Sequence, residues 1–249
     1  LRLVGSEMCI RDRNYYAKVY ILDHDLIRVL LTKDEKPHLN KTWLVAPGME
    51  DVPKEGRNRD DLSVFKLPSY HGEQIHDEFI IETDKVKATI QLDGFKIRWS
   101  MKLEDGSFVE IAKDRNTQAY NFDGSLGEGT FHYLTRTHDE QYYGLGEKAG
   151  NTNRYGKRYR MLSVDPMGYD AETTDPLYKH IPFYITRNMN TNISFGLFYD
   201  SMAKCTFDMG QEMDNYHGHY RYYQSASHDL DYYVIVGPTV KDLSLIHIS

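Results

Sequence analysis

Four carboxylates lie close together in one segment of the chain, with aromatic residues on either side. The segment reads RYRMLSVDPMGYDAETTDPLYKHIPFYI, and its acids are Asp165, Asp170, Glu172 and Asp175. Carboxylates accept hydrogen bonds from hydroxyl groups, and aromatic rings can cover the apolar faces of a sugar ring. The pattern is typical of a sugar-binding loop. An ordinary acidic loop explains it equally well, because the whole protein is net negative.

A glycine-rich stretch, YYGLGEKAG, comes shortly before these acids. Gly144, Gly146 and Gly150 do not have the spacing of a phosphate-binding loop, and no strand-to-helix pattern surrounds them. Taken alone, the stretch predicts a tight turn in which glycine lets backbones approach closely. We therefore expect no nucleotide and no other cofactor.

Histidine and cysteine give no metal-site pattern. His217 and His219 are two residues apart, but zinc needs three or four ligands, and neither CxxC nor HExxH is present. The surrounding NYHGHYRYY predicts a polar turn with glycine at its tip. Cys205 has no histidine nearby in the sequence, and we interpret it as a small buried hydrophobe. No metal site is predicted.

The clearest structural signal is an antiparallel meander. Apolar and polar residues alternate over 86–92 and again over 95–101, which indicates two strands with one buried face each. Asp-Gly at 93–94 has the residues of a two-residue hairpin loop. A second Asp-Gly at 105–106 precedes a third strand over 108–111.

Further strands are predicted on both sides of the meander. Residues 16–22 and 26–32 read as a hairpin, and 193–201 reads as a strand with one apolar face. DYYVIVGP, at 231–238, is apolar on both faces and therefore belongs at the centre of a sandwich. Between Pro37 and Pro68 we expect long loops and short edge strands.

The sequence predicts few helices. The best candidate follows Gly237-Pro238, where Thr239 and Asp242 have the spacing of a capping box. A helix should therefore begin at this point.

The two ends of the chain read as one DNA sequence in opposite orientations. LSLIHIS, residues 243–249, can be encoded by CTGTCTCTTATACACATCT, and the reverse complement of that string encodes MCIRD near the start. Unrelated peptides do not agree in this way by chance. We therefore expect residues 1–13 and 243–249 to be sequencing-adapter residues, not native, and 14–242 to be the biological segment.

Removing the predicted adapter residues changes the composition. Cys205 becomes the single cysteine, so no intrachain disulfide is possible, which fits a reducing, cytoplasmic compartment. The formal net charge of −7 becomes one unit more negative, which argues against a nucleic-acid partner. No apolar run is long enough to span a bilayer, so no membrane partner is expected.

Several stretches together, in this order and spacing, resemble one known family. They are YYGLGEKAG, SVDPMGYDAETTDPLYKHIPFYI, SFGLFYDS, FDMG and LDYYVIVGPTVKDL. The segment from Tyr16 to Asp242 resembles the N-terminal domain of glycoside hydrolase family 31, the α-glucosidase and α-xylosidase family, most strongly from Tyr142 onward. The resemblance implies an all-β, galactose-mutarotase-like antiparallel β-sandwich. In the family this domain packs against a (β/α)8 catalytic barrel, which is missing from this chain.

The resemblance also implies a retaining mechanism that acts on terminal α-linked glucosides, with an α-glucoside or oligosaccharide as partner. In such enzymes two carboxylates lie about 5–5.5 Å apart. In this family both are barrel aspartates, and the nucleophile lies in a Trp-x-Asp-Met context. Trp43 and Trp99 are followed by Leu44 and Ser100, so neither matches. We therefore expect no catalytic residue in this chain and no activity from it alone.

By the family's pattern, one loop of the N-terminal domain reaches over the barrel mouth. Asp165, in SVDPMGY, falls on that loop, where relatives tend to show Asn-Thr-Asp; Ser163-Val164 is the departure. The resemblance assigns Asp165 to hydrogen bonding of sugar hydroxyls near the +1 subsite, with Met167 and Tyr169 as weaker neighbours. The alternative is that Asp165 caps a turn.

The alternative function is a stand-alone carbohydrate-binding or aldose-1-epimerase-like β-sandwich. An epimerase would need a histidine acid and a glutamate base that converge in the concave side of one sheet. His71, His132 and Glu128 are the candidates.

Overall fold

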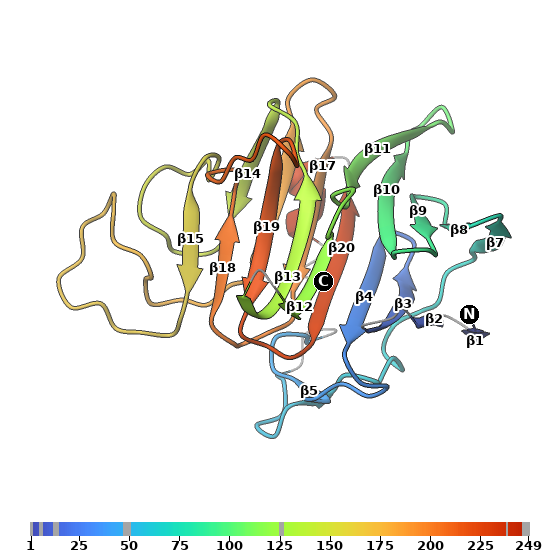
Figure 1. Cartoon of the computed structure of the whole chain (residues 1–249), viewed down its shortest axis with the longest axis horizontal. Helices are drawn as coiled ribbons and strands as arrows, with labels where there is room; N and C mark the ends of the chain where they lie inside the picture. The colour runs from blue at the N-terminus through green and yellow to red at the C-terminus, as the bar shows by residue number, and fades with distance from the viewer. Residues whose placement is uncertain are drawn as a thin grey trace.

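The computed structural model describes residues 2–4, 7–11, 15–46, 51–124, 127–237 and 239–245. Its largest sheet has eight antiparallel strands, in the order β1-β2-β3-β4-β20-β17-β16-β14 (Figure 1). The strands of this sheet are β1 (Arg2–Val4), β2 (Glu7–Arg11), β3 (Tyr16–Asp23), β4 (Leu26–Thr32), β14 (Glu140–Gly144), β16 (Phe183–Asn188), β17 (Ser194–Tyr199) and β20 (Leu230–Gly237).

Two five-stranded antiparallel sheets have the orders β11-β10-β9-β8-β7 and β12-β13-β19-β18-β15. The first contains β7 (His71–Ile75), β8 (Glu78–Glu82), β9 (Val86–Gln91), β10 (Lys96–Lys102) and β11 (Phe108–Lys113). The second contains β12 (Tyr120–Gly124), β13 (Gly127–Thr135), β15 (Arg158–Met161), β18 (Cys205–Asp208) and β19 (Tyr220–Ser225). A small two-stranded sheet pairs β5 (Lys41–Thr42) with β6 (Arg57–Asn58).

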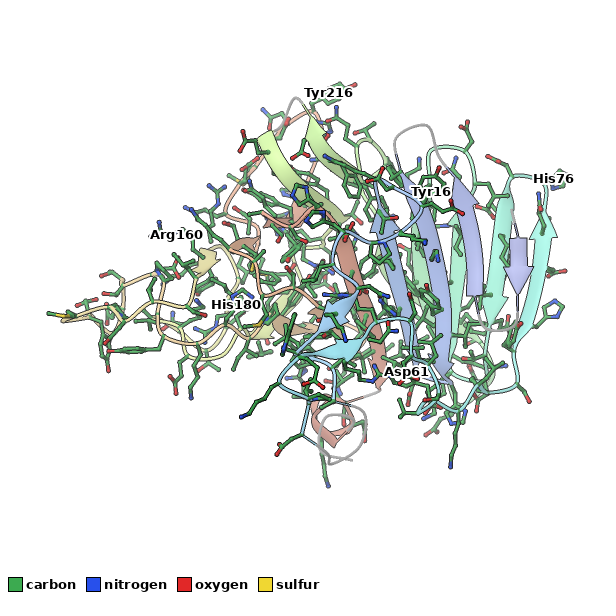
Figure 2. The ribbon with its side chains drawn as sticks, turned by 90° about the horizontal axis from the view of Figure 1, so that it is seen from below. Tyr16, Asp61, His76, Arg160, His180 and Tyr216 are labelled. Atoms are coloured by element: carbon green, nitrogen blue, oxygen red, sulfur yellow. The ribbon has the colours of Figure 1, made fainter. Side chains whose placement is uncertain are left out.

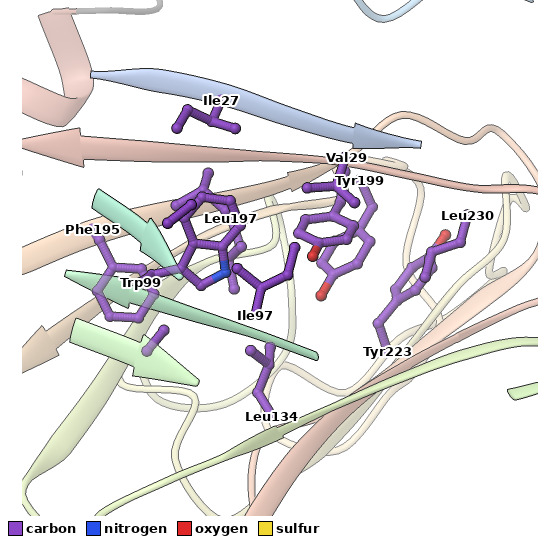
Figure 3. Packing of buried hydrophobic residues seen from close by; sticks show 14 of the residues in the cluster. Ile27, Val29, Ile97, Trp99, Leu134, Phe195, Leu197, Tyr199, Tyr223 and Leu230 are labelled. Atoms are coloured by element: carbon purple, nitrogen blue, oxygen red, sulfur yellow. The ribbon is translucent and has the colours of Figure 1, made fainter. Parts of the chain in front are cut away.

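The main core lies between the eight-stranded sheet and the two five-stranded sheets. Figure 3 shows Val29 and Leu197, from the large sheet, together with Trp99 of β10 and Leu134 of β13. Trp99 has only 1% of its surface exposed. Side chains from all three sheets therefore fill one apolar layer, and the predicted β-sandwich is confirmed.

Strand β20 lies at the centre of the large sheet, between β4 and β17. All eight of its residues are buried. Tyr232 and Val234 face the main core, whereas Tyr233 packs with a second cluster that includes Tyr20 and Leu30. The prediction of a central strand with both faces covered is confirmed.

The meander forms as predicted, but its first turn differs. Ile97 pairs with Ile90 and Trp99 with Ala88, so the alternating apolar residues share one face. The prediction of a two-residue loop was wrong, because residues 92–95 all lie outside the ladder. Phe95 explains the longer loop: its side chain is fully buried, and the backbone adopts a positive φ of 24° there.

The predicted hairpin of β3 and β4 and the predicted capping box are also present. Thr239 Oγ1 donates to Asp242 Oδ2 at 2.6 Å, and the Asp242 amide donates back to Thr239 Oγ1 at 3.2 Å. Helix α1 (Val240–Leu245) begins at this box. Strands β1 and β2, which lie within the predicted adapter residues, continue the large sheet beside β3. Among the residues that can be described, no helix has the length and apolar character to cross a membrane.

Candidate functional site

The predicted site residues lie on a long irregular loop, residues 162–182, between β15 and β16. This loop projects from one side of the molecule (Figure 1, yellow to orange). It carries a group of exposed large apolar side chains, namely Leu162, Met167, Tyr169, Tyr178 and Ile181. Such a concentration of exposed apolar groups on one segment is unusual for a surface that faces only water.

The three predicted sugar-binding residues are exposed on this loop. Met167 is 92% exposed and Tyr169 is 55% exposed. The Tyr169 ring meets the Tyr178 ring edge-on at 6.2 Å, and the Tyr178 hydroxyl donates to the carbonyl of Pro166 at 3.4 Å. Asp165 is exposed, and its carboxylate makes no hydrogen bond or ion pair with the residues that the structure describes. Its oxygens are therefore open to an external donor.

A neighbouring acid, Asp170, is the residue that caps a turn. Its Oδ1 accepts hydrogen bonds from the amides of Glu172 and Thr173, both at 2.9 Å, and from the Thr173 hydroxyl at 2.8 Å. The Thr173 hydroxyl, followed by the two amides, lowers the pKa of the Asp170 carboxyl. The turn-capping role considered for Asp165 therefore belongs to Asp170.

The base of the loop is fixed by a buried lysine. The Lys148 side chain is fully buried, and its Nζ donates to the carbonyl of Arg160 at 2.6 Å. The same Nζ lies 3.7 Å from Asp175 Oδ1, while Asp175 Oδ2 accepts the Arg160 amide at 2.7 Å. Burial lowers the pKa of Lys148, and the charge of Asp175 opposes that shift. The lysine thus joins the turn after β14 to Arg160, just before the loop, and to Asp175 within it.

Two further contacts hold the loop, one near its C-terminal end and one at its middle. His180 Nε2 donates to the carbonyl of Ser201 at 2.8 Å, and burial lowers the pKa of this imidazole. The amide of Gly150 donates to the carbonyl of Ala171 at 2.8 Å. Figure 2 places Arg160 and His180 on the side from which the loop projects. The loop is therefore held at its base and open at its outer part.

The glycine-rich stretch forms the predicted tight turn. Gly144 has a φ of 114°, and a Cβ there would lie 2.7 Å from the carbonyl oxygen of Phe183. Arg154 organises the turn, which the sequence analysis did not anticipate. Its guanidinium donates to the carbonyls of Gly144, Gly146, Lys148 and Asn151.

The residues considered for an epimerase do not form an accessible acid–base pair. His132 is fully buried, with Nε2 at 2.9 Å from Asp114 Oδ1 and Nδ1 at 2.9 Å from the Tyr199 hydroxyl. His71 lies on β7 and Glu128 on β13, in different sheets, and both are exposed. A substrate cannot reach the imidazole of His132, so this geometry argues against epimerase chemistry.

Cys205 is buried as predicted, and His217 and His219 lie at a polar turn, but the prediction of glycine at the tip of that turn was wrong. Residues 215–217 form the turn tip, and Gly218, with a φ of 74°, closes the turn through a bridge to Asp214. His217 Nδ1 lies 2.9 Å from Thr117 Oγ1. Cys205 is 2% exposed, and burial raises the pKa of its thiol to about 12. In the part of the chain that the structure describes, no three His, Cys, Asp or Glu side chains are grouped to hold a metal.

A second cluster of charged residues was not predicted. Arg28 donates through Nε and Nη2 to both carboxylate oxygens of Asp231, at 2.8 and 2.7 Å. Arg59 Nη1 donates to Asp200 Oδ2 at 2.6 Å and to Asp231 Oδ2 at 2.5 Å. Thr42 Oγ1 donates to Asp200 Oδ1 at 2.6 Å. No local motif could reveal this network, because Arg28 and Asp231 are 203 positions apart.

Comparison with known proteins identifies the family. Residues 16–208 match the family model of the glycosyl hydrolase 31 N-terminal galactose mutarotase-like domain. The chain belongs to this family. The match includes the 162–182 loop of this glycosyl hydrolase 31 domain and strands of all three large sheets.

Relatives of this glycosyl hydrolase 31 domain are much longer proteins. It is 25% identical over 185 residues to alpha-glucosidase 2 of Bacillus thermoamyloliquefaciens, which is 73% of this chain but only 22% of that protein. It is 35% identical over 107 residues to an alpha-xylosidase of Lactiplantibacillus pentosus, covering 42% of this chain and 12% of that protein. The chain thus spans about a fifth of alpha-glucosidase 2.

Solved structures show the same fold. The glycosyl hydrolase 31 domain superposes on a GH31 dextranase of Flavobacterium johnsoniae, solved with glucose, with a TM-score of 0.72 and 18% identity. That match covers 95% of this chain and 26% of the dextranase. A glucosidase II alpha subunit gives a TM-score of 0.69 at 17% identity, over 97% of this chain and 32% of the subunit.

Proposed function

We propose that this domain belongs to a retaining α-glycosidase that hydrolyses terminal α-linked glucosides. In this proposal the domain packs on a (β/α)8 barrel, and its 162–182 loop forms part of the substrate pocket. Membership of glycosyl hydrolase 31 supports the proposal, as do relatives named as an α-glucosidase and an α-xylosidase. Two barrel aspartates about 5–5.5 Å apart would act as nucleophile and acid–base.

The observation that carries the proposal is the contrast within the loop. Its base is held by the buried Lys148, whereas its outer part exposes the carboxylate of Asp165 beside Met167 and Tyr169. A carboxylate held on a fixed base accepts hydrogen bonds from hydroxyls with little loss of conformational entropy. Asp165 therefore hydrogen-bonds sugar hydroxyls near the +1 subsite, and Met167 and Tyr169 provide apolar contact.

The exposed apolar side chains of the loop support packing against another domain. Leu162 is 39% exposed and Ile181 is 41% exposed, and both lie at the ends of the loop, next to the sandwich. Contiguous apolar surface on a soluble protein marks an interaction site. The barrel is the partner that would bury these side chains, so the isolated domain should be poorly soluble.

Hydrolysis by matched preparations tests the activity. The complete protein, with the proposed barrel, and the segment 14–242 would each be expressed and assayed with an aryl α-glucoside. We expect hydrolysis with retained anomeric configuration from the complete protein and none from the segment. Cleavage by the segment alone, or an inverted product, would contradict the proposal.

The role of Asp165 is tested in the barrel-bearing protein. Asp165→Ala should reduce kcat/KM for oligosaccharides by roughly 10- to 100-fold, because a hydrogen bond to a charged group contributes about 1.5–3 kcal/mol. The aryl glucoside, which places no sugar in the +1 subsite, should be affected much less. Glu172→Gln is the control, since Glu172 is exposed on the same loop. Unchanged kinetics and chain-length preference in Asp165→Ala would refute the assignment.

We also propose that residues 1–13 and 243–249 derive from a sequencing adapter and that the parent enzyme is cytoplasmic. The back-translation of the two ends supports the first statement, and the unpaired Cys205 supports the second. Sequencing across both junctions from genomic DNA tests the adapter origin. A native reading frame that encodes the same end residues would overturn it.

A further inference from the structure

A groove in the sandwich is separate from the 162–182 loop. It has a volume of about 170 Å³ and lies between residues 37–43, the turn 200–203 and the turn 227–229. A cavity of roughly 150 Å³ is large enough for one benzene molecule. The groove is therefore on the scale of a single ring and not of an extended chain.

The floor of the groove is polar and held in place. Asp200 is 2% exposed and Asp231 is 5% exposed, and Arg59 bridges their carboxylates. Asp229 accepts the amide of His38 at 2.7 Å through Oδ2. Each ionised carboxylate oxygen has two acceptor positions, so these groups can accept hydrogen bonds beyond those that fix them.

Formal charges in and beneath the groove are balanced. Asp200, Asp229 and Asp231 supply three negative charges, and Arg28, Arg59 and Lys41 supply three positive ones. An anion would meet the carboxylates, and a cation would compete with guanidinium groups that are already hydrogen-bonded. The charge balance therefore favours a neutral ligand that is rich in hydrogen-bonding groups.

An immobilised indole forms one wall. Trp43 lines the groove and is 42% exposed, and its Nε1 donates to the carbonyl of Lys54 at 3.0 Å. Gly56 lies against the indole, where a Cβ would come within 2.8 Å of two ring carbons. The glycine thus allows the backbone to pack on the ring, and the ring is held before any ligand arrives.

Two histidines form part of the rim. The rings of His38 and His228 are 4.4 Å apart, and both residues are exposed. Their ring nitrogens make no hydrogen bond with other described residues. Each neutral imidazole therefore offers one donor and one acceptor to a ligand in the groove.

We propose that this groove binds one pyranose ring of a neutral saccharide. The apolar face of the sugar packs on Trp43, and its hydroxyl groups hydrogen-bond with Asp229, His38 and His228. The site depends on residues of the sandwich alone. None of the lining residues belongs to the 162–182 loop, although His180 of that loop donates to the carbonyl of Ser201 at the groove. The site therefore does not depend on the proposed hydrolase function.

Intrinsic fluorescence provides a direct test. Trp43 and Trp99 are the two tryptophans of the chain, and Trp99 is 1% exposed, so a ligand in the groove should change the Trp43 signal alone. We expect saturable quenching or a shift on titration of the full 249-residue chain with glucose. Ethylammonium and inorganic phosphate, as cation and anion probes, should give no saturable change. No response to glucose, or a response only to a charged probe, would overturn the proposal.

Variants locate the binding by ligand-observed NMR with glucose. Trp43→Phe should retain most of the affinity, whereas Trp43→Ala and Asp229→Asn should each weaken binding at least tenfold. Gly56→Ala is a second variant, because its methyl group displaces the indole without removing it; it should also weaken binding. Circular dichroism would verify that each variant is folded.

Two controls separate this groove from other surfaces. Tyr216→Ala removes an aromatic ring that is 83% exposed and does not line the groove, so it should leave glucose binding unchanged. Asp165→Ala tests the 162–182 loop. Loss of glucose binding in Asp165→Ala together with normal binding in Trp43→Ala would overturn the groove site and leave the proposed hydrolase function standing.

Discussion

Two irregular segments are attached to the same sandwich in different ways. Residues 37–46 and 51–62 lie against it through a dense network of buried charges, in which Arg59 contacts both Asp200 and Asp231. Residues 162–182 project from it and are held at their base by Lys148. The first attachment shapes a groove, and the second presents exposed side chains. The comparison shows that the segment whose ion pairs are more completely buried packs against the sandwich, whereas the segment with partly exposed ion pairs projects from it.

The difference follows from the free energy of burying charge. The Arg28 and Asp231 side chains are 1% and 3% exposed, so each must be fully paired to offset its desolvation. At the base of the projecting loop the Lys148 side chain is also buried, but its partner Asp175 is 21% exposed and the nearby Arg160 is 55% exposed, so water solvates part of their charge. Loss of one group should therefore be far more costly in the first region than in the second.

Arg28→Met should have the largest effect, because it leaves the Asp231 carboxylate buried without its bidentate partner. We expect a loss of about 3–5 kcal/mol in the free energy of unfolding, measured by urea denaturation. The double variant Arg28→Met/Asp231→Leu should recover much of this loss, since it removes both charges. If Arg28→Met alone were as stable as the wild type, buried ion pairs would not explain the difference between the two segments.

Lys148→Met should have an intermediate and local effect. It removes the Nζ hydrogen bond to the Arg160 carbonyl and the nearby charge of Asp175, at a cost of about 1–3 kcal/mol. Limited proteolysis should cut within residues 162–182 sooner than in the wild type. Lys179→Met removes an ion pair with Glu147 in which both side chains are exposed. It should change neither the unfolding free energy nor the rate of proteolysis.

The groove-side network should also show an unusual pH dependence. Burial, and then the charge of Asp231, raise the pKa of Asp200 to about 6. Because this pKa lies above that of the unfolded chain, the folded state binds the proton more tightly, and the contribution of Asp200 to stability falls as pH rises from about 4 to about 6. Above that window the contribution is constant.

Asp200→Asn should remove this trend. The stability of the variant relative to the wild type should rise between pH 4 and 6 and then level off, as followed by urea denaturation at each pH. Asp105→Asn is a control whose relative stability should change with pH in the opposite direction, because hydrogen bonds from Ser107 lower the pKa of Asp105. Stability from Asp105 is lost as pH falls, so a parallel trend in the two variants would contradict the assignment.

Asp165→Ala should have the smallest effect on stability. Its carboxylate has no hydrogen bond among the described residues, so the change in unfolding free energy should stay within about 0.5 kcal/mol. Thermal unfolding of the 249-residue chain measures this directly. A larger loss would mean that Asp165 supports the loop, and the comparison between anchored base and free tip would fail.

Local patterns predicted the sandwich strands well. Alternation placed β9 and β10, a doubly apolar run placed β20 at the centre of its sheet, and Thr239 with Asp242 marked the start of α1. Each of these signals depends on residues close in sequence. The first meander turn was the exception, because the burial of Phe95 lengthened a loop whose Asp-Gly pair predicted a shorter one.

The site was only partly predictable for the same reason. Asp165, Met167 and Tyr169 are close in sequence and were predicted on one loop, but no local pattern shows that Lys148 holds its base. The groove was missed entirely, because Thr42 meets Asp200 from 158 positions away. Long-range ion pairs leave no local periodicity, and only the folded chain brings their partners together.

The central position of β20 has a consequence for synthesis. β4 is synthesised about 200 residues before β20, the strand that pairs with one of its edges. A ribosome that makes this protein therefore releases the β3–β4 hairpin long before its neighbour exists. Such non-local pairing slows folding and leaves an apolar strand edge open in the meantime. The nascent chain is thus most exposed to aggregation until residue 237 has emerged, when the last strand closes the sheet.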